Sequence, residues 1–223
     1  MVELITGLSA ERIRANLAEV SDELAAAAAR AGRGGRPAEI LAATKYVAAS
    51  DLPILAEAGV RLVGENRAQD LQEKTAVHGA LFEWDFIGQL QSRRVRLIVP
   101  HVRLIHSVAS ESALAALARH RDEARPGLGI LIEVNIAGED GKAGIAPREL
   151  DAFVERAPVP VAGLMTMPPQ AERAEDSRRW FAALRGLADE RGLEHASMGT
   201  SQDYAVAAEE GATIVRIGTR LYH

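Results

Sequence analysis

Short β-like runs alternate with helix-like segments along most of the chain, and this alternation constrains the fold more than any other feature. Most of the runs are continuously apolar rather than alternating, as expected for parallel strands that are covered on both faces. Eight runs are candidate strands: EILAAT (39–44), RLVGE (61–65), WDFIG (84–88), RLIHSV (103–108), GILIEVN (129–135), PVAGLM (160–165), HASMG (195–199) and TIVRIG (213–218). Helices are expected between them at 51–58, 66–77, 111–119, 148–156 and 172–191.

Eight strand–helix repeats fit a closed barrel better than an open doubly wound sheet. A barrel of this kind needs at least about 200 residues, so one barrel would use the whole chain of 223 residues. No composition shift or low-complexity linker divides the sequence. We therefore expect an α/β fold in which residues 1–223 form a single domain, a (β/α)8 TIM barrel.

An additional helix is predicted before the first strand, over residues 9–31. There Ile13, Leu17, Val20 and Leu24 follow one another at steps of four and three residues, which is the apolar stripe of an amphipathic helix. The stretch GRGGRP (32–37) ends it as a loop. This helix is an addition to the minimal barrel, and we expect it to cover the bottom or the side.

The composition excludes several classes of function. A net charge of −5 argues against binding to nucleic acid or to anionic membranes, and the basic run Arg93, Arg94 and Arg96 is interpreted as a solvated helix face. The chain has no cysteine and its six histidines are scattered, so neither a disulfide nor a metal site is expected. Without a secretory signal or a membrane-spanning stretch, a soluble cytoplasmic protein is predicted.

Lys45 is the first candidate for chemistry. It follows the first predicted strand, in AATKYV, and it is one of three lysines in the chain. In barrels of this type the working residues lie where strands end and loops begin. A lysine amine in a partly desolvated site keeps its neutral form, which attacks aldehydes to give a Schiff base. The alternative is a lysine that extends from the barrel rim into water.

Small residues follow the seventh and eighth predicted strands. In SMGTSQDYAVA, Ser201 is a candidate N-cap for a helix that starts near Gln202, and in RIGTRLY the pair Gly218 and Thr219 allows close approach of a backbone. Phosphate sites recur after these two strands in barrels of many activities. The two turns together therefore predict a phosphate site, and ordinary capped turns are the alternative.

Arg216 lies inside the eighth predicted strand. Because burying an unpaired charge is costly, its side chain should point into a polar site or pair with a carboxylate. The ring nitrogen of a cofactor is one possible partner. A structural salt bridge with Glu65 or Glu133 is the other.

These residues belong to a longer pattern that runs in order from about residue 38 to residue 222. It consists of TKYV (44–47), GENRAQD (64–70), WDFIGQLQSRRVR (84–96), IHSVAS (105–110), EVNIAGEDGKAGI (133–145), GLMTM (163–167), SMGTSQDYAVAAEEGAT (197–213) and RIGT (216–219). The pattern resembles the YggS/PROSC family of pyridoxal phosphate homeostasis proteins. The motifs are specific as a set, although TKYV or RIGT alone would not be.

The resemblance implies the barrel of the N-terminal domain of bacterial alanine racemase and a pyridoxal 5′-phosphate cofactor. It implies these roles: a covalent internal aldimine on Lys45, a phosphate held by Ser201 with Gly218 and Thr219, Arg216 facing the pyridine nitrogen, and Asn66, Met165 and Ser197 lining the pocket. The chain departs from the family pattern at Gln89, Arg93, Ala143 and His223. None of those departures touches the proposed lysine or phosphate residues.

An arginine opposite the pyridine nitrogen makes the ring a poor electron sink, because arginine does not readily give up its proton. Racemisation also needs acid/base groups on both faces of the substrate, and none of Tyr46, Tyr204 and Tyr222 belongs to a second domain. The resemblance thus implies a non-catalytic monomer that stores the cofactor or delivers it to apo-enzymes in vitamin B6 homeostasis.

Three other hypotheses stay open at this point. The chain could be a small amino-acid racemase that uses Lys45 and a nearby tyrosine. It could be an aldolase-like barrel that acts on a phosphorylated sugar through a Schiff base on Lys45. Lys142, in the loop GEDGKAGI after the fifth predicted strand, is either a solvated loop charge or a transient acceptor of the cofactor.

Overall fold

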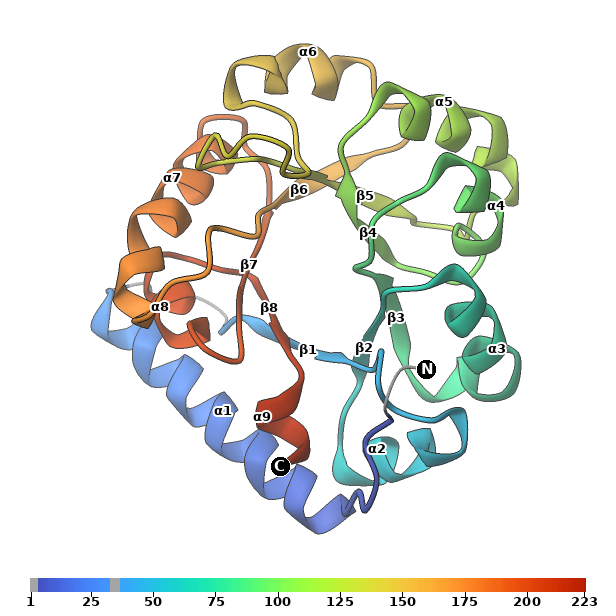
Figure 1. Cartoon of the computed structure of the whole chain (residues 1–223), viewed down its shortest axis with the longest axis vertical. Helices are drawn as coiled ribbons and strands as arrows, with labels where there is room; N and C mark the ends of the chain where they lie inside the picture. Colours follow the sequence, from blue (N-terminus) through green and yellow to red (C-terminus); the bar gives the residue numbers. More distant parts are fainter. Residues whose placement is uncertain (1–3, 33–36) are drawn as a thin grey trace.

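The computed structural model describes residues 4–32 and 37–223. Its centre is a closed parallel barrel in which each strand pairs with the next and β8 pairs with β1 (Figure 1). The strands are β1 (Glu39–Ala43), β2 (Leu62–Glu65), β3 (Glu83–Phe86), β4 (Leu104–Val108), β5 (Gly129–Glu133), β6 (Val161–Met165), β7 (His195–Thr200) and β8 (Ile214–Ile217). The prediction of a (β/α)8 barrel is confirmed.

All eight predicted runs contain a strand, and several strands end earlier than their apolar run. The run 84–88 continues past Phe86, where β3 ends, and the run 129–135 continues past Glu133, where β5 ends. At these points the chain leaves the ladder for loops at the carboxyl ends of the strands. The residues beyond the strand ends are therefore available to line a site at that end of the barrel.

Helices surround the barrel on its outer side (Figure 1). They are α2 (Leu52–Ala58), α3 (Ala68–His78), α4 (Val95–Ile98), α5 (Glu111–His120), α6 (Leu150–Glu155), α7 (Arg178–Asp189), α8 (Tyr204–Glu209) and α9 (Thr219–Tyr222). Short 3-10 turns lie at Ala49–Asp51, Gly79–Leu81, Ser92–Arg94, Arg121–Glu123, Pro147–Glu149 and Ala174–Ser177. The helix predicted over 172–191 begins later than expected, at Arg178, because a 3-10 turn precedes it.

The additional N-terminal helix is α1 (Ala10–Arg30), and it lies along the side of the barrel, against α2, α8 and α9 (Figure 1). Ser9 caps it, since its hydroxyl accepts from the backbone N–H of Arg12. The amide of Asn16 donates to the carbonyls of Leu221 and His223, each at 3.1 Å, and so fixes α9. Of the loop predicted at 32–37, residues 33–36 lie outside the described residues.

Two apolar clusters build the core. The larger one packs the barrel wall against the helices, with Trp84, Phe86 and Phe181 almost fully buried. A smaller cluster comprises Leu41, Leu62, Leu104, Leu131, Met165 and Ile214. Among the described helices, none combines the length and the apolar character that crossing a bilayer requires.

Candidate functional site

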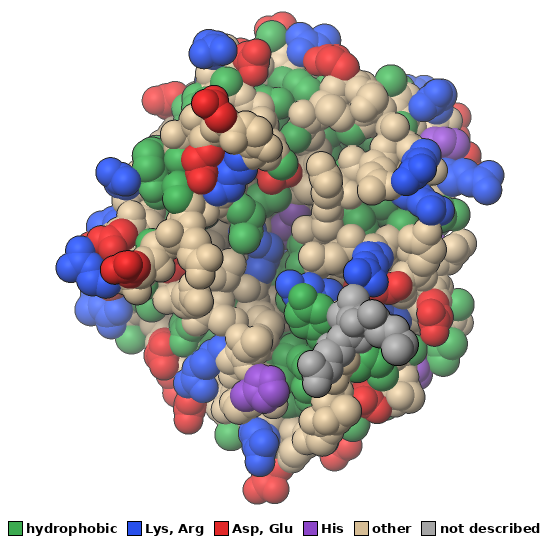
Figure 2. Space-filling view, viewed as in Figure 1, with side chains coloured by type: hydrophobic (Ala, Val, Ile, Leu, Met, Phe, Trp, Pro, Cys, Tyr) green, Lys and Arg blue, Asp and Glu red, His purple; other side chains and the backbone are tan. Residues whose placement is uncertain are grey.

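A cavity of about 340 Å³ lies at the carboxyl ends of β1 and β8. Figure 2 shows a hollow at the centre of this face, with basic side chains along it. Six of the eight residues predicted from the sequence are among those that line the cavity: Lys45, Asn66, Ser201, Arg216, Gly218 and Thr219. The barrel therefore brings together residues that lie as far as 174 positions apart in the sequence (45 to 219).

Lys45 lies in the turn that follows β1, at the mouth of the cavity. Its ammonium nitrogen is 4.6 Å from the centre of the Tyr46 ring, close enough for a cation–π contact. The side chain is exposed, which corrects the expectation of a partly desolvated lysine. The reason is that Lys45 leaves the strand where the wall opens to solvent.

A buried ion pair lies directly behind Lys45. Lys74 of α3 contacts Glu65 at 2.5 Å, and it also donates to the carbonyl of Thr44 at 2.8 Å. The hydroxyl of Thr44 donates to the same carboxylate at 2.6 Å. These contacts fix the ends of β1 and β2, from which Lys45 and Asn66 emerge. Glu65 thus pairs with Lys74 and not with Arg216, contrary to one alternative from the sequence.

Asn66 carries an unsatisfied polar atom at the cavity. Its side-chain oxygen Oδ1 is buried and has no hydrogen-bond partner among the described residues. The backbone here is held by close packing, since a Cβ atom at Gly88 would lie 1.9 Å from the carbonyl oxygen of Asn66. An orphaned acceptor in a fixed position is unusual in a folded protein, and it is available to a ligand.

Arg216 points from β8 into the cavity and is 8% exposed. Its guanidinium donates to the hydroxyl of Ser197 at 2.5 Å, to the carbonyl of Thr166 at 3.0 Å and to the sulfur of Met167 at 2.9 Å. Within residues 4–32 and 37–223, no carboxylate lies within ion-pair distance of it, so a salt bridge with Glu133 is also absent. Burial lowers the pKa of Arg216 to about 10.

The turns after β7 and β8 meet at the edge of the cavity. The hydroxyl of Ser201 accepts from the backbone N–H of Gly218 at 3.2 Å. This corrects the prediction that Ser201 caps a helix starting near Gln202: α8 begins at Tyr204, and Asp203 occupies its N-cap position. Thr219 is the first residue of α9, so its N–H has no partner inside that helix.

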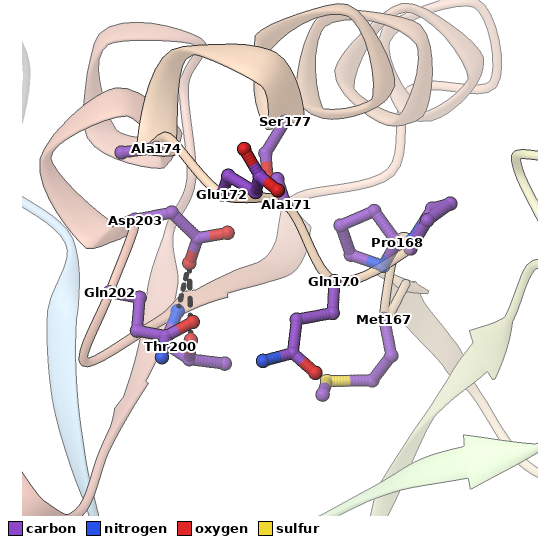
Figure 3. Close-up of a pocket in the computed structure, with 11 residues that line it drawn as sticks. Met167, Pro168, Gln170, Ala171, Glu172, Ala174, Ser177, Thr200, Gln202 and Asp203 are labelled. Carbon is purple, nitrogen blue, oxygen red and sulfur yellow. Dashed lines mark hydrogen bonds between the residues drawn. The ribbon is translucent and has the colours of Figure 1, made fainter.

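A second cavity, of about 500 Å³, adjoins the first. Figure 3 shows the residues that line it. This cavity lies between residues 167–177 and the turn 200–203, and Met167, Thr200 and Gln202 line both cavities. The carboxylate of Asp203 accepts from the N–H of Thr200 at 2.7 Å and from its hydroxyl at 3.2 Å, as drawn in Figure 3. These bonds hold the turn that separates the two cavities.

Met165 and Ser197 do not line the cavity. Met165 belongs to the smaller apolar cluster, and Ser197 is fully buried beneath Arg216. Sequence reasoning missed Met167, which does line the cavity. The alternation of side chains along an extended chain could have found it, because a residue two positions beyond Met165 projects on the same side.

Comparisons with known proteins show which family the chain belongs to. The family model of the alanine racemase N-terminal domain matches residues 9–223. A curated relative from Aquifex aeolicus, named pyridoxal phosphate homeostasis protein, is 39% identical over 217 residues, which cover 92% of this chain and 95% of the relative. The chain belongs to the family of pyridoxal phosphate homeostasis proteins.

Solved structures of this family and beyond it support the fold. PipY of Synechococcus elongatus, solved with pyridoxal phosphate bound, has 30% identity and a TM-score of 0.74, and the match covers 90% of this chain and all of PipY. Alanine racemase from Bartonella henselae is 16% identical with a TM-score of 0.69, and the match covers 96% of this chain and 59% of the racemase. The second likeness shows the barrel alone. The resemblance to homeostasis proteins drawn from the sequence is confirmed.

Proposed function

We propose that this chain binds pyridoxal 5′-phosphate in the cavity at Lys45 and Arg216, as a cytoplasmic carrier of the cofactor. The observation that carries the proposal is Arg216, a buried cation with no carboxylate partner among the described residues, in the wall of a cavity whose mouth holds Lys45. The names of the relatives and the cofactor bound to PipY support it.

The lining residues fit this ligand. The Ser201 hydroxyl and the backbone N–H groups of Gly218 and Thr219 offer donors to a phosphate, and binding would displace the Gly218–Ser201 contact. The side chain of Asn66, with its orphaned oxygen, offers a polar group to the ring substituents. Arg216 offers N–H donors to the ring nitrogen. The phosphate and the ring nitrogen of the ligand thus each have a partner of the right kind.

Pyridoxal phosphate supplies an aldehyde that condenses with primary amines and a ring that can withdraw electrons. Lys45 is the exposed amine at the cavity mouth, and we infer that its Nζ makes the covalent Schiff-base bond. Arg216 keeps its own proton, because even its lowered pKa of about 10 lies well above neutral pH. It therefore donates a hydrogen bond without protonating the ring nitrogen, which limits electron withdrawal.

The tyrosines favour a carrier over a racemase. Tyr204 donates to Glu23 of α1 at 2.5 Å, outside the cavity. Tyr222 lines the cavity, but its hydroxyl donates to the carbonyl of Ala43 at 3.1 Å, and burial raises its pKa above the usual value. It is consequently a poor base. We propose that the chain acts as a monomer and releases its cofactor to apo-enzymes.

Visible absorption of the purified chain with added pyridoxal phosphate tests the proposal. We expect a Schiff-base band that Lys45→Ala abolishes and that the matched variant Lys142→Ala keeps, since Lys142 lies outside the cavity and pairs with Glu139. Borohydride reduction followed by peptide mapping should place the label on Lys45. A band that survives in Lys45→Ala, or a label on another amine, would contradict the assignment.

A small racemase is the second candidate, because Tyr46 and Tyr222 line the same cavity as Lys45. Exchange of the α-proton of added amino acids with deuterated solvent separates the two functions. A carrier predicts no exchange above that of free pyridoxal phosphate. Multiple turnovers that stop in Tyr222→Phe would establish the racemase.

A further inference from the structure

A line of buried polar side chains crosses the barrel interior beneath the cavity. Asp85 of β3, His106 of β4 and Ser197 of β7 are each 0% exposed, and they lead to Arg216 of β8. The carboxylate of Asp85 is 3.1 Å from Nε2 of His106, Nδ1 of His106 is 2.9 Å from the Ser197 hydroxyl, and that hydroxyl is 2.5 Å from Nη1 of Arg216. Four strands therefore contribute one side chain each to a continuous hydrogen-bonded path.

Asp85 fixes the direction of the hydrogen bonds at the lower end of the path. Arg103 donates to both of its carboxylate oxygens, and the backbone N–H of Leu104 donates to one of them at 3.1 Å. Although burial alone raises the pKa of Asp85, its contacts with His106 and Arg103 bring that pKa below the usual range. An ionised carboxylate only accepts, so Nε2 of His106 must carry the hydrogen of this contact.

The charge of His106 determines which group donates in each of the next two hydrogen bonds. Burial lowers the pKa of His106, and this outweighs the opposite effect of Asp85, so the ring is neutral near pH 7. A neutral ring with its hydrogen on Nε2 has a bare acceptor at Nδ1. The hydroxyl of Ser197 then donates to Nδ1 and accepts from Arg216, which can only donate. Every contact from Arg216 to Asp85 has one donor and one acceptor, and all donors point toward Asp85.

We propose that Asp85, His106 and Ser197 form a positioning relay that holds the guanidinium of Arg216 in the orientation that a cofactor ring requires. The inference rests on the proposed function, because it assigns the relay to the site that would bind pyridoxal phosphate. The relay and the neighbouring groups Thr166 and Met167 occupy three of the five N–H donors of Arg216. The Nε donor and one Nη1 donor have no partner among the described residues.

The chain offers a matched control for this relay. Ser107 follows His106 on β4, is 6% exposed, and donates its hydroxyl to the carbonyl of Gly88. It is a buried, hydrogen-bonded serine like Ser197, but it makes no contact with Arg216. A loss of binding caused only by removing a buried hydroxyl should therefore be the same in Ser107→Ala and in Ser197→Ala.

The first test is the tautomer of His106, measured by ¹⁵N NMR on the full chain without cofactor near pH 7. His106→Gln identifies the resonances. We expect a neutral ring with the proton on Nε2 and, in Ser197→Ala, a shifted Nδ1 resonance because its hydrogen bond is lost. A doubly protonated ring, a proton on Nδ1, or an unchanged Nδ1 resonance in Ser197→Ala would overturn the relay. None of these results depends on cofactor binding.

The second test compares binding of pyridoxal phosphate in the two serine variants. A hydrogen bond to a charged group supports a weakening of about tenfold for Ser197→Ala, against about twofold or less for Ser107→Ala. The position of the visible band should shift only in Ser197→Ala. Equal weakening would show a merely structural role and overturn the proposal. If the native chain bound no cofactor, the proposed function would fail, and the NMR result would decide the relay by itself.

Discussion

Two networks of buried charged side chains lie on either side of the barrel wall, and they end differently. Outside the wall, Glu65 and Lys74 form an ion pair that Thr44 completes. Inside it, the path from Asp85 ends at Arg216, which has no carboxylate within ion-pair distance in the described chain. The first network is closed, and the second opens into a cavity.

The difference suggests that the outer network contributes to stability and the inner one to binding. A buried charge is tolerated when a partner of opposite sign compensates its lost hydration, as Lys74 does for Glu65. Arg216 has only neutral hydrogen-bond acceptors, and burial lowers its pKa accordingly. A charged side chain that stays buried without a partner of opposite charge indicates a site where a bound ligand supplies the missing interaction. The comparison therefore predicts a large loss of stability for one cation and a small change for the other when each is replaced by an apolar side chain of similar length.

The largest effect is expected for Lys74→Met. It leaves the carboxylate of Glu65 buried without its partner, which costs about 3–5 kcal/mol of the free energy of unfolding. Urea denaturation without cofactor measures the change. Arg156→Ala is the control, because its ion pair with Glu111 is exposed and worth at most about 1 kcal/mol. Equal losses in the two variants would show that the buried pair adds nothing to stability.

A smaller effect is expected from pH, through the inner network. Because the pKa of His106 is lowered by folding, the unfolded chain takes up a proton near pH 6.5 while the native chain does not. The unfolded state then binds more protons, so stability falls as the pH drops below about 6.5, by at most about 1.4 kcal/mol per pH unit. Asp85, whose folded pKa is depressed, loses its contribution only below about pH 4.

The variant His106→Asn isolates this effect. Its free energy of unfolding should fall less steeply between pH 7 and pH 5 than that of the native chain, whatever its stability at pH 7. Denaturation curves at several pH values give both slopes. Arg216, Arg103 and Asp85 all face the ring and keep their charge over this range, so they do not contribute to the difference. Identical slopes would mean that His106 is protonated in the folded state as well.

The sequence was sufficient to predict the barrel because the patterns that indicate its strands and helices are local. Continuous apolar runs such as GILIEVN predict buried parallel strands, and the stripe of α1 predicts a separate helix before them. The turns with Ser201 and Gly218 were identified as one site because both follow strands that end at the same face. What the signals did not predict is which groups pair there. Ser201 meets Gly218, 17 residues away, only because β7 and β8 are adjacent.

The sequence could not predict which charged side chains pair with one another, for the same reason. Glu65 and Arg216 both lie in strands, and nothing in the local pattern shows that Glu65 contacts α3 outside the wall while Arg216 faces the interior. The relay residues Asp85 and His106 were likewise hidden in apolar runs, where a polar residue has no periodic signature. Strand register decides these contacts, and register is a property of the closed barrel.

The smallest change in stability is expected for Arg216→Met. This variant tests most directly whether the inner network differs from the outer one. It removes a poorly compensated charge from the interior and leaves no carboxylate unpaired, so the free energy of unfolding should change by no more than about 1 kcal/mol. The lost bonds to Ser197 and Thr166 and the gain from apolar burial act in opposite directions. Binding of pyridoxal phosphate should nevertheless weaken strongly, because the ring nitrogen loses its donor. If Arg216→Met instead destabilised the chain as much as Lys74→Met, the inner network would be structural like the outer one, and the distinction between them would fail.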